Sequence, residues 1–258
     1  RDTKTKVTSS SSEERDSEDK DTRDKFLVVG CGFCGLAVCA SLSRNGIAYE
    51  AAEKNEEIGG NWYNGVYETV HIISSRKTTQ YTDYPMPSHY PDFPSAQQMI
   101  QYLNEYCDTM KVRPNIRFRT TVDHIEFHRS SDANKGDDAG AGAGDGQSYY
   151  RVQMTDLSTG ETRVKQYRGV IIANGHHWDM RWPKYPNQEC FKGEIIHSKM
   201  YKHPRQLHDK RVLVIGGGNS ACDIATEAAR FARESHLSLR RGYWFIPRCL
   251  GGRPTVEQ

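Results

Sequence analysis

The chain has 258 residues, of which 36% are hydrophobic, and a formal net charge of +2. This length accommodates one large or two medium-sized domains with cores of their own. The balanced charge does not indicate a nucleic-acid partner, and no apolar run reaches the roughly 18 residues of a membrane-spanning helix. The 7 cysteines follow no disulfide-framework spacing. That usage is typical of a reducing compartment, so we expect a cytoplasmic protein.

Two segments have compositions that do not support a packed core. Residues 1–24 mix acidic and basic side chains around a run of serines, and residues 132–147 consist largely of glycine, alanine and aspartate. Such segments bury too little apolar surface to offset the entropy lost on ordering. We therefore predict a disordered tail at the first and a flexible loop at the second, between strands at 122–128 and 149–155.

The first motif with chemical content is a glycine-rich loop behind a short apolar run. Phe26–Val29 is typical of a buried parallel strand, and Gly30-Cys31-Gly32-Phe33-Cys34-Gly35 follows it directly. The first glycine of such a loop permits a tight turn, and the second lets the backbone approach a pyrophosphate. The third lets the next helix pack against the strand. The pattern predicts a dinucleotide site.

The residues behind this loop complete a strand–helix–strand unit. Apolar residues recur at helical spacing from Phe33 to Ala40, and Asn45-Gly46 is a helix stop signal. Residues 47–52 are expected to form the second strand. Glu53 then stands where a carboxylate accepts hydrogen bonds from an adenosine ribose.

The cysteines of the first loop allow two interpretations. Cys31 and Cys34 form a C-x-x-C pattern, which is found in redox dithiols. Because the glycines already account for the loop and the cysteines occupy its variable positions, we favour small apolar side chains that only fill space.

A second loop of the same type follows the apolar run Val212–Ile215. Gly216-Gly217-Gly218-Asn219-Ser220-Ala221 opens a segment whose apolar residues continue at helical spacing to Ala232. We expect Asn219 or Ser220 to cap this helix, with its N-terminus facing the phosphates of a second dinucleotide.

Basic residues distinguish the second site from the first. An expected strand at 237–239 leads into Arg240-Arg241, and no acid occupies the position equivalent to Glu53. An arginine binds a 2′-phosphate through its fork of donors, whereas a carboxylate repels it. The first site therefore favours FAD and the second NADPH. The alternative is an exposed basic pair without a ligand.

Two further segments resemble the flavin-containing monooxygenases. Glu57-Ile58-Gly59-Gly60-Asn61-Trp62 contains the Gly-Gly-x-Trp pattern that lies along FAD in that family. Residues 191–201 are similar to its F-x-G-x-x-x-H-x-x-x-(Y/W) fingerprint. The similarity extends through residues 82–95, an expected helix at 97–109 and the strand and turn at 169–175.

The resemblance implies an α/β fold with two Rossmann-like dinucleotide-binding domains. Residues 25–178 would bind FAD, and residues 179–258 would form the NADP-binding domain, entered through the fingerprint. Only two strands of the second domain are recognisable before Gln258. We therefore expect a truncated second domain and a chain that corresponds to about the first half of a typical family member.

The implied cofactor contacts come from both glycine-rich loops and from neighbouring segments. For FAD they are Gly30, Gly32, Phe33, Cys34, Gly35, Glu53, Lys54, Gly60, Asn61, Trp62, Val122, Ala173 and Gly175. For NADPH they are Gly216, Gly218, Asn219, Ser220, Arg240 and Arg241. The fingerprint positions that would couple the two domains are Phe191, Gly193, His197 and Tyr201, where His197 has an organising rather than an acid–base role.

No catalytic residue and no metal site is assigned. Many family members carry an asparagine near the flavin within the segment equivalent to 67–81, and this chain has none there. Ser74 or Ser75 is the candidate for a replacement hydrogen bond. The pair His176-His177 lacks a third ligand at a metal spacing.

The implied reaction is a monooxygenation that uses FAD, NADPH and O2. By resemblance, NADPH reduces the flavin, a C4a-hydroperoxyflavin forms, and one oxygen passes to a soft nitrogen or sulfur of a small molecule, as in N,N-dimethylaniline monooxygenase. Tyr201-Lys202, in place of a Trp-Pro ending, favours this reaction over Baeyer–Villiger chemistry.

Three alternatives stay open. The chain could belong to a Baeyer–Villiger-type monooxygenase, or to another flavoprotein with two dinucleotides, such as a disulfide reductase that uses Cys31 and Cys34. An alternative of a different class is a non-catalytic nucleotide-binding remnant. The sequence indicates neither the substrate nor the oligomeric state.

Overall fold

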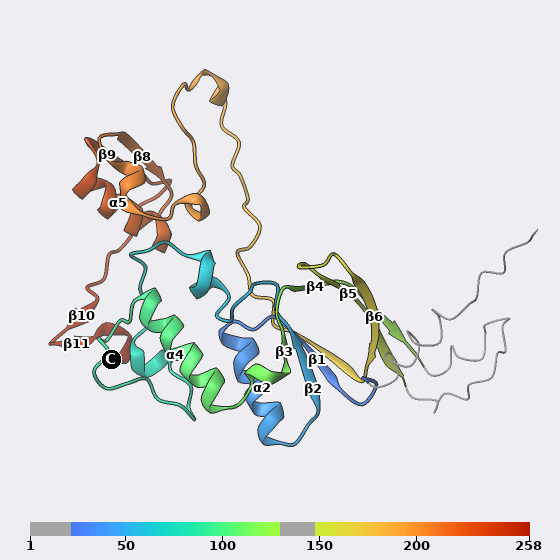
Figure 1. The fold of residues 1–258 in the computed structure, drawn as a ribbon. Helices are drawn as coiled ribbons and strands as arrows, with labels where there is room; N and C mark the ends of the chain where they lie inside the picture. Colours follow the sequence, from blue (N-terminus) through green and yellow to red (C-terminus); the bar gives the residue numbers. More distant parts are fainter. Residues whose placement is uncertain (1–21, 130–147) are drawn as a thin grey trace, which may run out of the picture. The chain divides into compact units, whose positions relative to one another are not determined.

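The computed structural model describes residues 22–129 and 148–258 (Figure 1). The predicted flexible loop at 132–147 and all but the last residues of the predicted tail lie outside this description. The chain divides into two compact units, each built from two separate stretches. Unit 1 combines residues up to 60 with residues 103–175, and unit 2 combines residues 61–102 with residues 176–258. The FAD and NADP domain assignments stay predictions, because the units reflect packing and not ligands.

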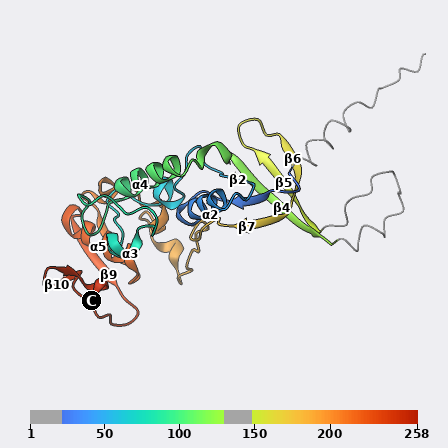
Figure 2. The same cartoon turned by 90° about the horizontal axis from the view of Figure 1, so that it is seen from below.

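Unit 1 contains a parallel sheet in the order β3-β2-β1-β7. β1 (Phe26–Val29) lies between β2 (Tyr49–Ala52) and β7 (Gly169–Ile172), and β3 (Ile116–Arg117) pairs with β2. α2 (Phe33–Arg44) connects β1 to β2 and runs along the sheet (Figures 1 and 2). This arrangement confirms the predicted strand–helix–strand unit of an α/β fold.

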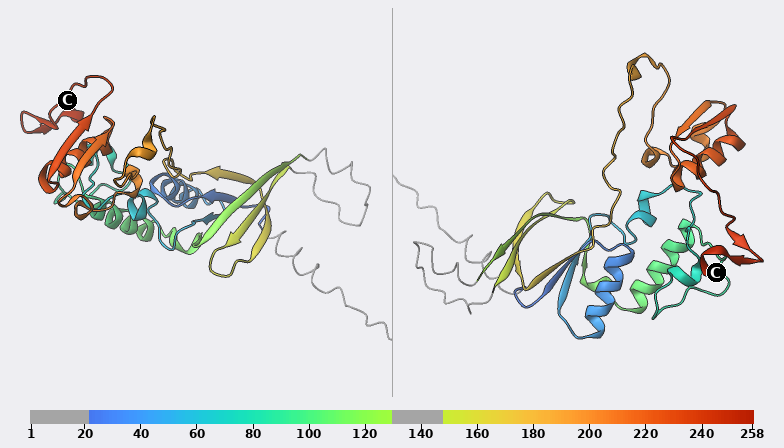
Figure 3. Two further views of the ribbon diagram at one scale, coloured as in Figure 1. Left: turned by 90° about the horizontal axis from the view of Figure 1, so that it is seen from above. Right: turned by 180° about the vertical axis from the view of Figure 1, so that it is seen from behind.

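An antiparallel sheet of three strands packs beside the parallel one (Figure 3). Its strands are β4 (Thr120–His128), β5 (Tyr149–Asp156) and β6 (Thr162–Tyr167). The predicted strands at 122–128 and 149–155 are therefore present and are neighbours. The buried side chains that join the two sheets are Leu27, Ala52, Val152, Met154 and Tyr167.

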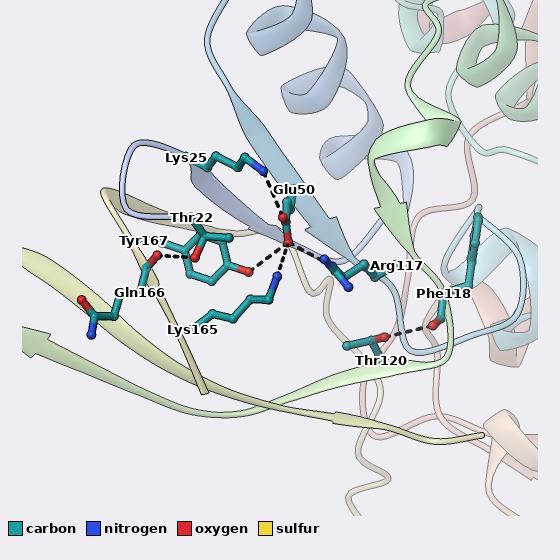
Figure 4. Close-up of polar contacts among 9 residues, drawn as sticks. All are labelled: Thr22, Lys25, Glu50, Arg117, Phe118, Thr120, Lys165, Gln166 and Tyr167. Carbon is teal, nitrogen blue, oxygen red and sulfur yellow. Dashed lines mark hydrogen bonds and ion pairs between the residues drawn. The ribbon is translucent and has the colours of Figure 1, made fainter. Parts of the chain in front are cut away.

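A half-buried charge lies beside these apolar contacts. Glu50 of β2 is on the same face as Ala52, because alternate residues of a strand share a face. Its carboxylate is 3.0 Å from Nε of Arg117, 3.4 Å from Nζ of Lys25 and 3.5 Å from Nζ of Lys165. Glu50 thus connects β2 to the strand beside it, to the start of β1 and to the antiparallel sheet (Figure 4).

Unit 2 contains a second strand–helix–strand unit. β8 (Arg211–Ile215) and β9 (Glu234–Ser238) are parallel and are connected by α5 (Asn219–Phe231). The prediction of a strand at 237–239 was wrong in its bounds, because β9 pairs with β8 from Glu234 and its pairing ends at Ser238. Leu239 therefore lies beyond the strand.

The rest of the described chain forms short elements and one longer helix. α4 (Ala96–Thr109) confirms the helix expected at 97–109 and crosses the division between the units. The short elements are η1 (Asn61–Gly65), α3 (Arg76–Thr79), η2 (Arg113–Asn115), η4 (Gln188–Cys190), η5 (Ser198–Met200), η6 (Pro204–Leu207), β10 (Cys249–Leu250), β11 (Arg253–Pro254) and η7 (Thr255–Glu257). Among the helices of the described ranges, none has both the length and the apolar character needed to cross a bilayer.

The charge cluster predicts a specific loss of stability in acid. Burial acts to raise the pKa of Glu50, but Arg117, Lys165 and Lys25 overcome this and lower it to about 2. A carboxyl group with a lowered pKa stabilises the fold fully above its unfolded value near 4.5 and loses that effect as the pH falls toward 2. The shift corresponds to about 3 kcal/mol, which the partial exposure of the cluster to solvent reduces to about 2 kcal/mol.

We expect Glu50→Gln to lower the free energy of unfolding by about 2 kcal/mol at pH 7 and to flatten its decline between pH 4.5 and 2. Denaturant titrations across this pH range measure both effects. Glu161→Gln is the matched control, because Glu161 forms an exposed pair with Arg163 at 3.0 Å. If the free energy of unfolding of the wild type and of Glu50→Gln declined equally between pH 4.5 and 2, a lowered pKa of Glu50 would be contradicted.

Candidate functional site

The first glycine-rich loop lies where β1 ends, at the carboxyl end of the parallel sheet. The amide of Gly30 donates to the carbonyl of Ala52 at 2.8 Å, and the amide of Ala173 donates to the carbonyl of Val29 at 2.8 Å. The loop therefore begins between the ends of β2 and β7. Ligands of open α/β sheets bind outside the carboxyl ends of the strands.

Close backbone contacts explain the glycines of this loop. Gly30 has a φ of +95°, and a Cβ on Gly35 would lie 1.9 Å from the carbonyl oxygen of Gly30. Gly60 has a φ of +56°, and its Cβ would lie 3.1 Å from the Cα of Gly32. Two stretches of backbone without side chains thus face each other. Such a surface suits the close approach of a pyrophosphate.

Glu53 is fixed in place by the loop. The residue is 4% exposed. Its Oε2 accepts from the amide of Cys31 at 2.7 Å, and its Oε1 accepts from the amide and the side chain of Asn55 at 2.9 Å. A carboxylate has about four lone-pair sites, so acceptor capacity remains for a further donor such as a ribose hydroxyl. The sequence analysis did not identify Asn55 as a partner of Glu53. Its position two residues after Glu53 is the feature that could have indicated this role.

The two loop cysteines have different surroundings. Cys31 is buried and Cys34 is exposed, and both are free thiols. A hydrogen bond with Cys39, together with burial, raises the pKa of the Cys31 thiol well above its ordinary value. A thiol that stays protonated is a poor nucleophile, which favours the space-filling interpretation.

The other predicted FAD contacts lie on several elements. Phe33 is the first residue of α2, Lys54 is exposed behind β2, and Val122 is half-buried in β4. Gly175 has a φ of +73° behind β7. Asn61 and Trp62 belong to η1, at the start of the first stretch of unit 2.

The second glycine-rich loop repeats the strand-end geometry of the first. The amide of Gly216 donates to the carbonyl of Ser238 at 3.0 Å, as that of Gly30 does to Ala52. Gly216 has a φ of +131°. The expectation that Asn219 or Ser220 caps the helix was wrong: Gly218, in an extended conformation, is the N-cap and no side chain caps it. The amides at the start of α5 therefore have no competing side-chain acceptor at the cap.

The equivalent strand-end bonds of the two loops show which residues after β9 correspond to those after β2. Ala52 and Ser238 receive the same bond, so Leu239 corresponds to Glu53 and Arg240 follows one residue later. Arg240 and Arg241 are exposed, and neither has a hydrogen-bond or ion-pair partner within residues 22–129 and 148–258. The second site thus has a leucine at the position of the buried carboxylate and two exposed arginines directly after it.

Two carboxylates on α5 form a network that the sequence analysis missed. Asp223 and Glu227 share one face of the helix, since residues four apart lie on successive turns. Tyr67 donates to Asp223 at 2.6 Å, and the hydroxyls of Tyr201 and Thr69 both donate to Glu227. The rings of Tyr67 and Tyr201 are 5.6 Å apart. The i, i+4 spacing of the two acids is the signal that sequence reasoning could have used.

This network touches both the second loop and the fingerprint. Ser220, the second residue of α5, is close enough to Tyr67 to lower the pKa of its phenol, although larger effects oppose it. Burial and the neighbouring carboxylates raise the pKa of Tyr67 and of Tyr201, so both phenols stay protonated as donors. The predicted phosphate site at the start of α5 is therefore connected to residues 67–69 and to Tyr201.

The other fingerprint residues have local contacts. The Phe191 ring lies over Gly193, where a Cβ would be 2.4 Å from the ring. Nδ1 of His197 accepts from the amide of Lys199 at 3.1 Å and caps η5. Tyr201 is 1% exposed. His197 thus organises a turn, and Tyr201 anchors the segment in the core of unit 2.

The catalytic candidates also make local contacts. The Ser75 hydroxyl accepts from the amide of Thr78 at 3.3 Å and caps α3. The Ser74 and Thr79 hydroxyls are 2.6 Å apart. His176 and His177 are exposed, and no group of three potential metal ligands exists in the part of the chain that the structure describes.

We expect Tyr201→Phe to lower the free energy of unfolding by about 1–3 kcal/mol, because Glu227 then stays buried with one donor fewer. Thermal or denaturant unfolding measures the loss. Tyr185→Phe is the control, since Tyr185 is 41% exposed. The double variant Tyr201→Phe/Glu227→Gln should lose less than the sum of the single variants, and strict additivity would contradict a direct bond.

Comparisons with known proteins agree with this geometry. Residues 23–255 match the family described as flavin-binding monooxygenase-like. The chain is 31% identical over 238 residues to flavin-containing monooxygenase 5 of Homo sapiens, covering 88% of this chain and 42% of that protein. It is 29% identical to dimethylaniline monooxygenase [N-oxide-forming] 2 of Oryctolagus cuniculus, over 87% of this chain and 41% of that protein.

A solved structure has the same fold. OTEMO in a complex with FAD and NADP matches at 25% identity with a TM-score of 0.61, over 84% of this chain and 38% of that chain. The present chain spans less than half the length of these relatives. The family match nevertheless covers both loops and the fingerprint, so the chain belongs to the flavin-binding monooxygenase-like family.

Proposed function

We propose that this chain supplies the FAD- and NADPH-binding parts of a monooxygenase that transfers one oxygen atom of O2 to a soft nitrogen or sulfur nucleophile. One observation carries the proposal. Two loops share the same strand-end geometry, yet a buried carboxylate, Glu53, directly follows β2, whereas Leu239 and then Arg240-Arg241 follow β9.

The first loop is the proposed FAD site. The backbone at Gly30, Gly32, Gly35 and Gly60 carries no side chain that would keep a pyrophosphate away. Glu53 retains acceptor capacity beside the loop and would bind a ribose with free hydroxyls. A 2′-phosphate placed there would meet a buried negative charge, which favours FAD over NADPH at this loop.

The second loop is the proposed NADPH site. The start of α5 presents backbone amides and the positive end of the helix dipole to the phosphates. Arg240 or Arg241 would bind the 2′-phosphate as a fork of donors, which both side chains are free to do within the described residues. The Tyr67 hydroxyl supports the first part of this helix through its 2.6 Å hydrogen bond to Asp223.

The cofactors would supply the chemistry, namely hydride delivery by NADPH and oxygen activation at the flavin. The residues of this chain would hold and orient the two cofactors. The name of the Oryctolagus cuniculus relative, an N-oxide-forming monooxygenase, supports a heteroatom as the oxygen acceptor. The Tyr201-Lys202 ending of the fingerprint agrees with that choice. A cytoplasmic location, suggested by free cysteines, belongs to the same proposal.

Flavin binding tests the first part. The purified chain is expected to take up FAD and to release it on denaturation, which absorbance and chromatography of the released flavin detect. Gly35→Ala should abolish uptake, because the new Cβ would lie 1.9 Å from the Gly30 carbonyl oxygen. Gly242→Ala is the control, since a Cβ there meets nothing within 4 Å. A folded wild-type chain that cannot be loaded with FAD would favour the non-catalytic remnant.

Nucleotide preference tests the second part. We expect Arg240→Ala, alone or with Arg241→Ala, to weaken NADP⁺ binding about tenfold or more and to leave NAD⁺ binding within about twofold, because only the 2′-phosphate contact is lost. Calorimetric titration measures both. Arg211→Ala, an exposed arginine at the opposite end of β8, should change neither. Equal weakening of NADP⁺ and NAD⁺ binding would contradict a 2′-phosphate contact at Arg240 or Arg241.

The products test the type of oxygen transfer. If the chain loaded with FAD formed lactones or esters from ketones, Baeyer–Villiger chemistry would be favoured.

A further inference from the structure

A pocket of about 720 Å³ lies in unit 1, away from the glycine-rich loop. It is lined by Lys25 before β1, by Ser43 near the end of α2, by residues 47–50 around the start of β2 and by residues 114–117, which include β3. Lys25 precedes β1, whereas Gly30 follows it, so the pocket and the predicted FAD loop lie at opposite ends of the same strand. The family-type cofactor motifs contribute no residue to its lining.

The pocket wall carries more positive than negative charge. Lys25 and Arg117 line it directly, and Glu50 is the one carboxylate among its described lining residues. Lys165 contacts the same carboxylate at 3.5 Å, so three cations surround one anion (Figure 4). Tyr167 donates a further hydrogen bond to Glu50 at 3.2 Å. The group as a whole has a surplus of two positive charges.

The cations are only partly engaged. Arg117 uses Nε to reach Glu50, and its two terminal nitrogens have no partner within the described ranges 22–129 and 148–258. The Lys25 contact with Glu50 is long, at 3.4 Å. Burial, together with the charges of Arg117 and Lys25, holds the pKa of Lys165 below its ordinary value in spite of Glu50. One carboxylate therefore does not neutralise the cluster.

The other residues that line the pocket suit a small organic group. The hydroxyls of Ser43 and Tyr49 are 2.9 Å apart, so one of their two hydrogens is available to another acceptor. Burial raises the pKa of Tyr49, which stays a neutral donor. Ile47 and Pro114 add apolar surface to the same pocket.

We propose that this pocket binds a small phosphate monoester, with the phosphate between Lys25 and the terminal nitrogens of Arg117 and the organic group against Ile47 and Pro114. A phosphate monoester carries about 1.5–2 negative charges at pH 7, which matches the surplus. A guanidinium with two free terminal nitrogens binds phosphate oxygens in a bidentate manner. The site is independent of the dinucleotide loops and of the monooxygenase reaction.

Phenyl phosphate is the probe, titrated calorimetrically into the full chain with FAD and NADP⁺ in excess so that the phosphate sites of the loops are blocked. Saturable binding at one site per chain is expected, with no binding of phenol and weaker binding of inorganic phosphate. Arg117→Met and Lys25→Met should each weaken binding about tenfold or more, because each removes a charged donor to the phosphate. Arg117→Lys keeps the positive charge but loses the bidentate donors of the guanidinium, so its affinity for phenyl phosphate should lie between those of Arg117→Met and the wild type.

Arg163→Met is the matched control, because Arg163 is 46% exposed and pairs with Glu161 at 3.0 Å, much as Arg117 is 44% exposed and pairs with Glu50 at 3.0 Å. It should leave binding within about twofold of the wild type. Circular dichroism checks that each variant is folded. If Arg117→Met does not fold, Lys25→Met by itself tests the proposal. Absence of phenyl phosphate binding by the folded wild type would overturn the proposal. Unchanged binding in folded Arg117→Met and Lys25→Met, or equal weakening by Arg163→Met, would overturn it as well.

Discussion

The backbone contact between Gly35 and the carbonyl of Gly30 is the constraint on which the first unit depends. A Cβ at residue 35 would lie 1.9 Å from that oxygen, so α2 keeps its position beside β1 only with glycine there. The same turn places Gly30 against the ends of β2 and β7 through its bonds and contacts with Ala52 and Ala173. The start of α2 and the shape of the loop therefore depend on this close approach.

A carboxylate connects several elements within each unit, but the partners of the two carboxylates differ in charge. In unit 1, Glu50 is surrounded by cations, which lower its pKa and leave an excess of positive charge. In unit 2, Glu227 is satisfied by the neutral hydroxyls of Tyr201 and Thr69, and the tyrosine pKa rises instead. A charge balanced by neutral donors fixes geometry without creating a surplus. The cation cluster, in contrast, retains a capacity to bind an anion.

The two loops differ most in the residue behind their second strand. Both begin with a positive-φ glycine whose amide bonds to the last residue of the neighbouring strand. Glu53 then turns inward and secures the loop through Cys31, whereas Arg240 remains exposed. The same backbone geometry is thus followed by a buried carboxylate in one unit and, one and two residues further on, by two exposed arginines in the other. This difference in charge is the basis on which we propose two different dinucleotides.

The sequence by itself determined β1, α2, α4, β8 and α5, because apolar periodicity and glycine stop signals are local properties. It also determined the α/β class, the two loops and, through the fingerprint, the family. Only the tertiary structure decided that Glu53 is fixed by Cys31 and Asn55 and that Gly218 caps α5. It also decided that Leu239, and not an arginine, is the structural counterpart of Glu53. Likewise, the partners of Glu50 and Glu227 come from residues far away in the chain. Local patterns fix which segments form strands and helices, but hydrogen bonds between distant side chains depend on register and packing, which no local pattern encodes.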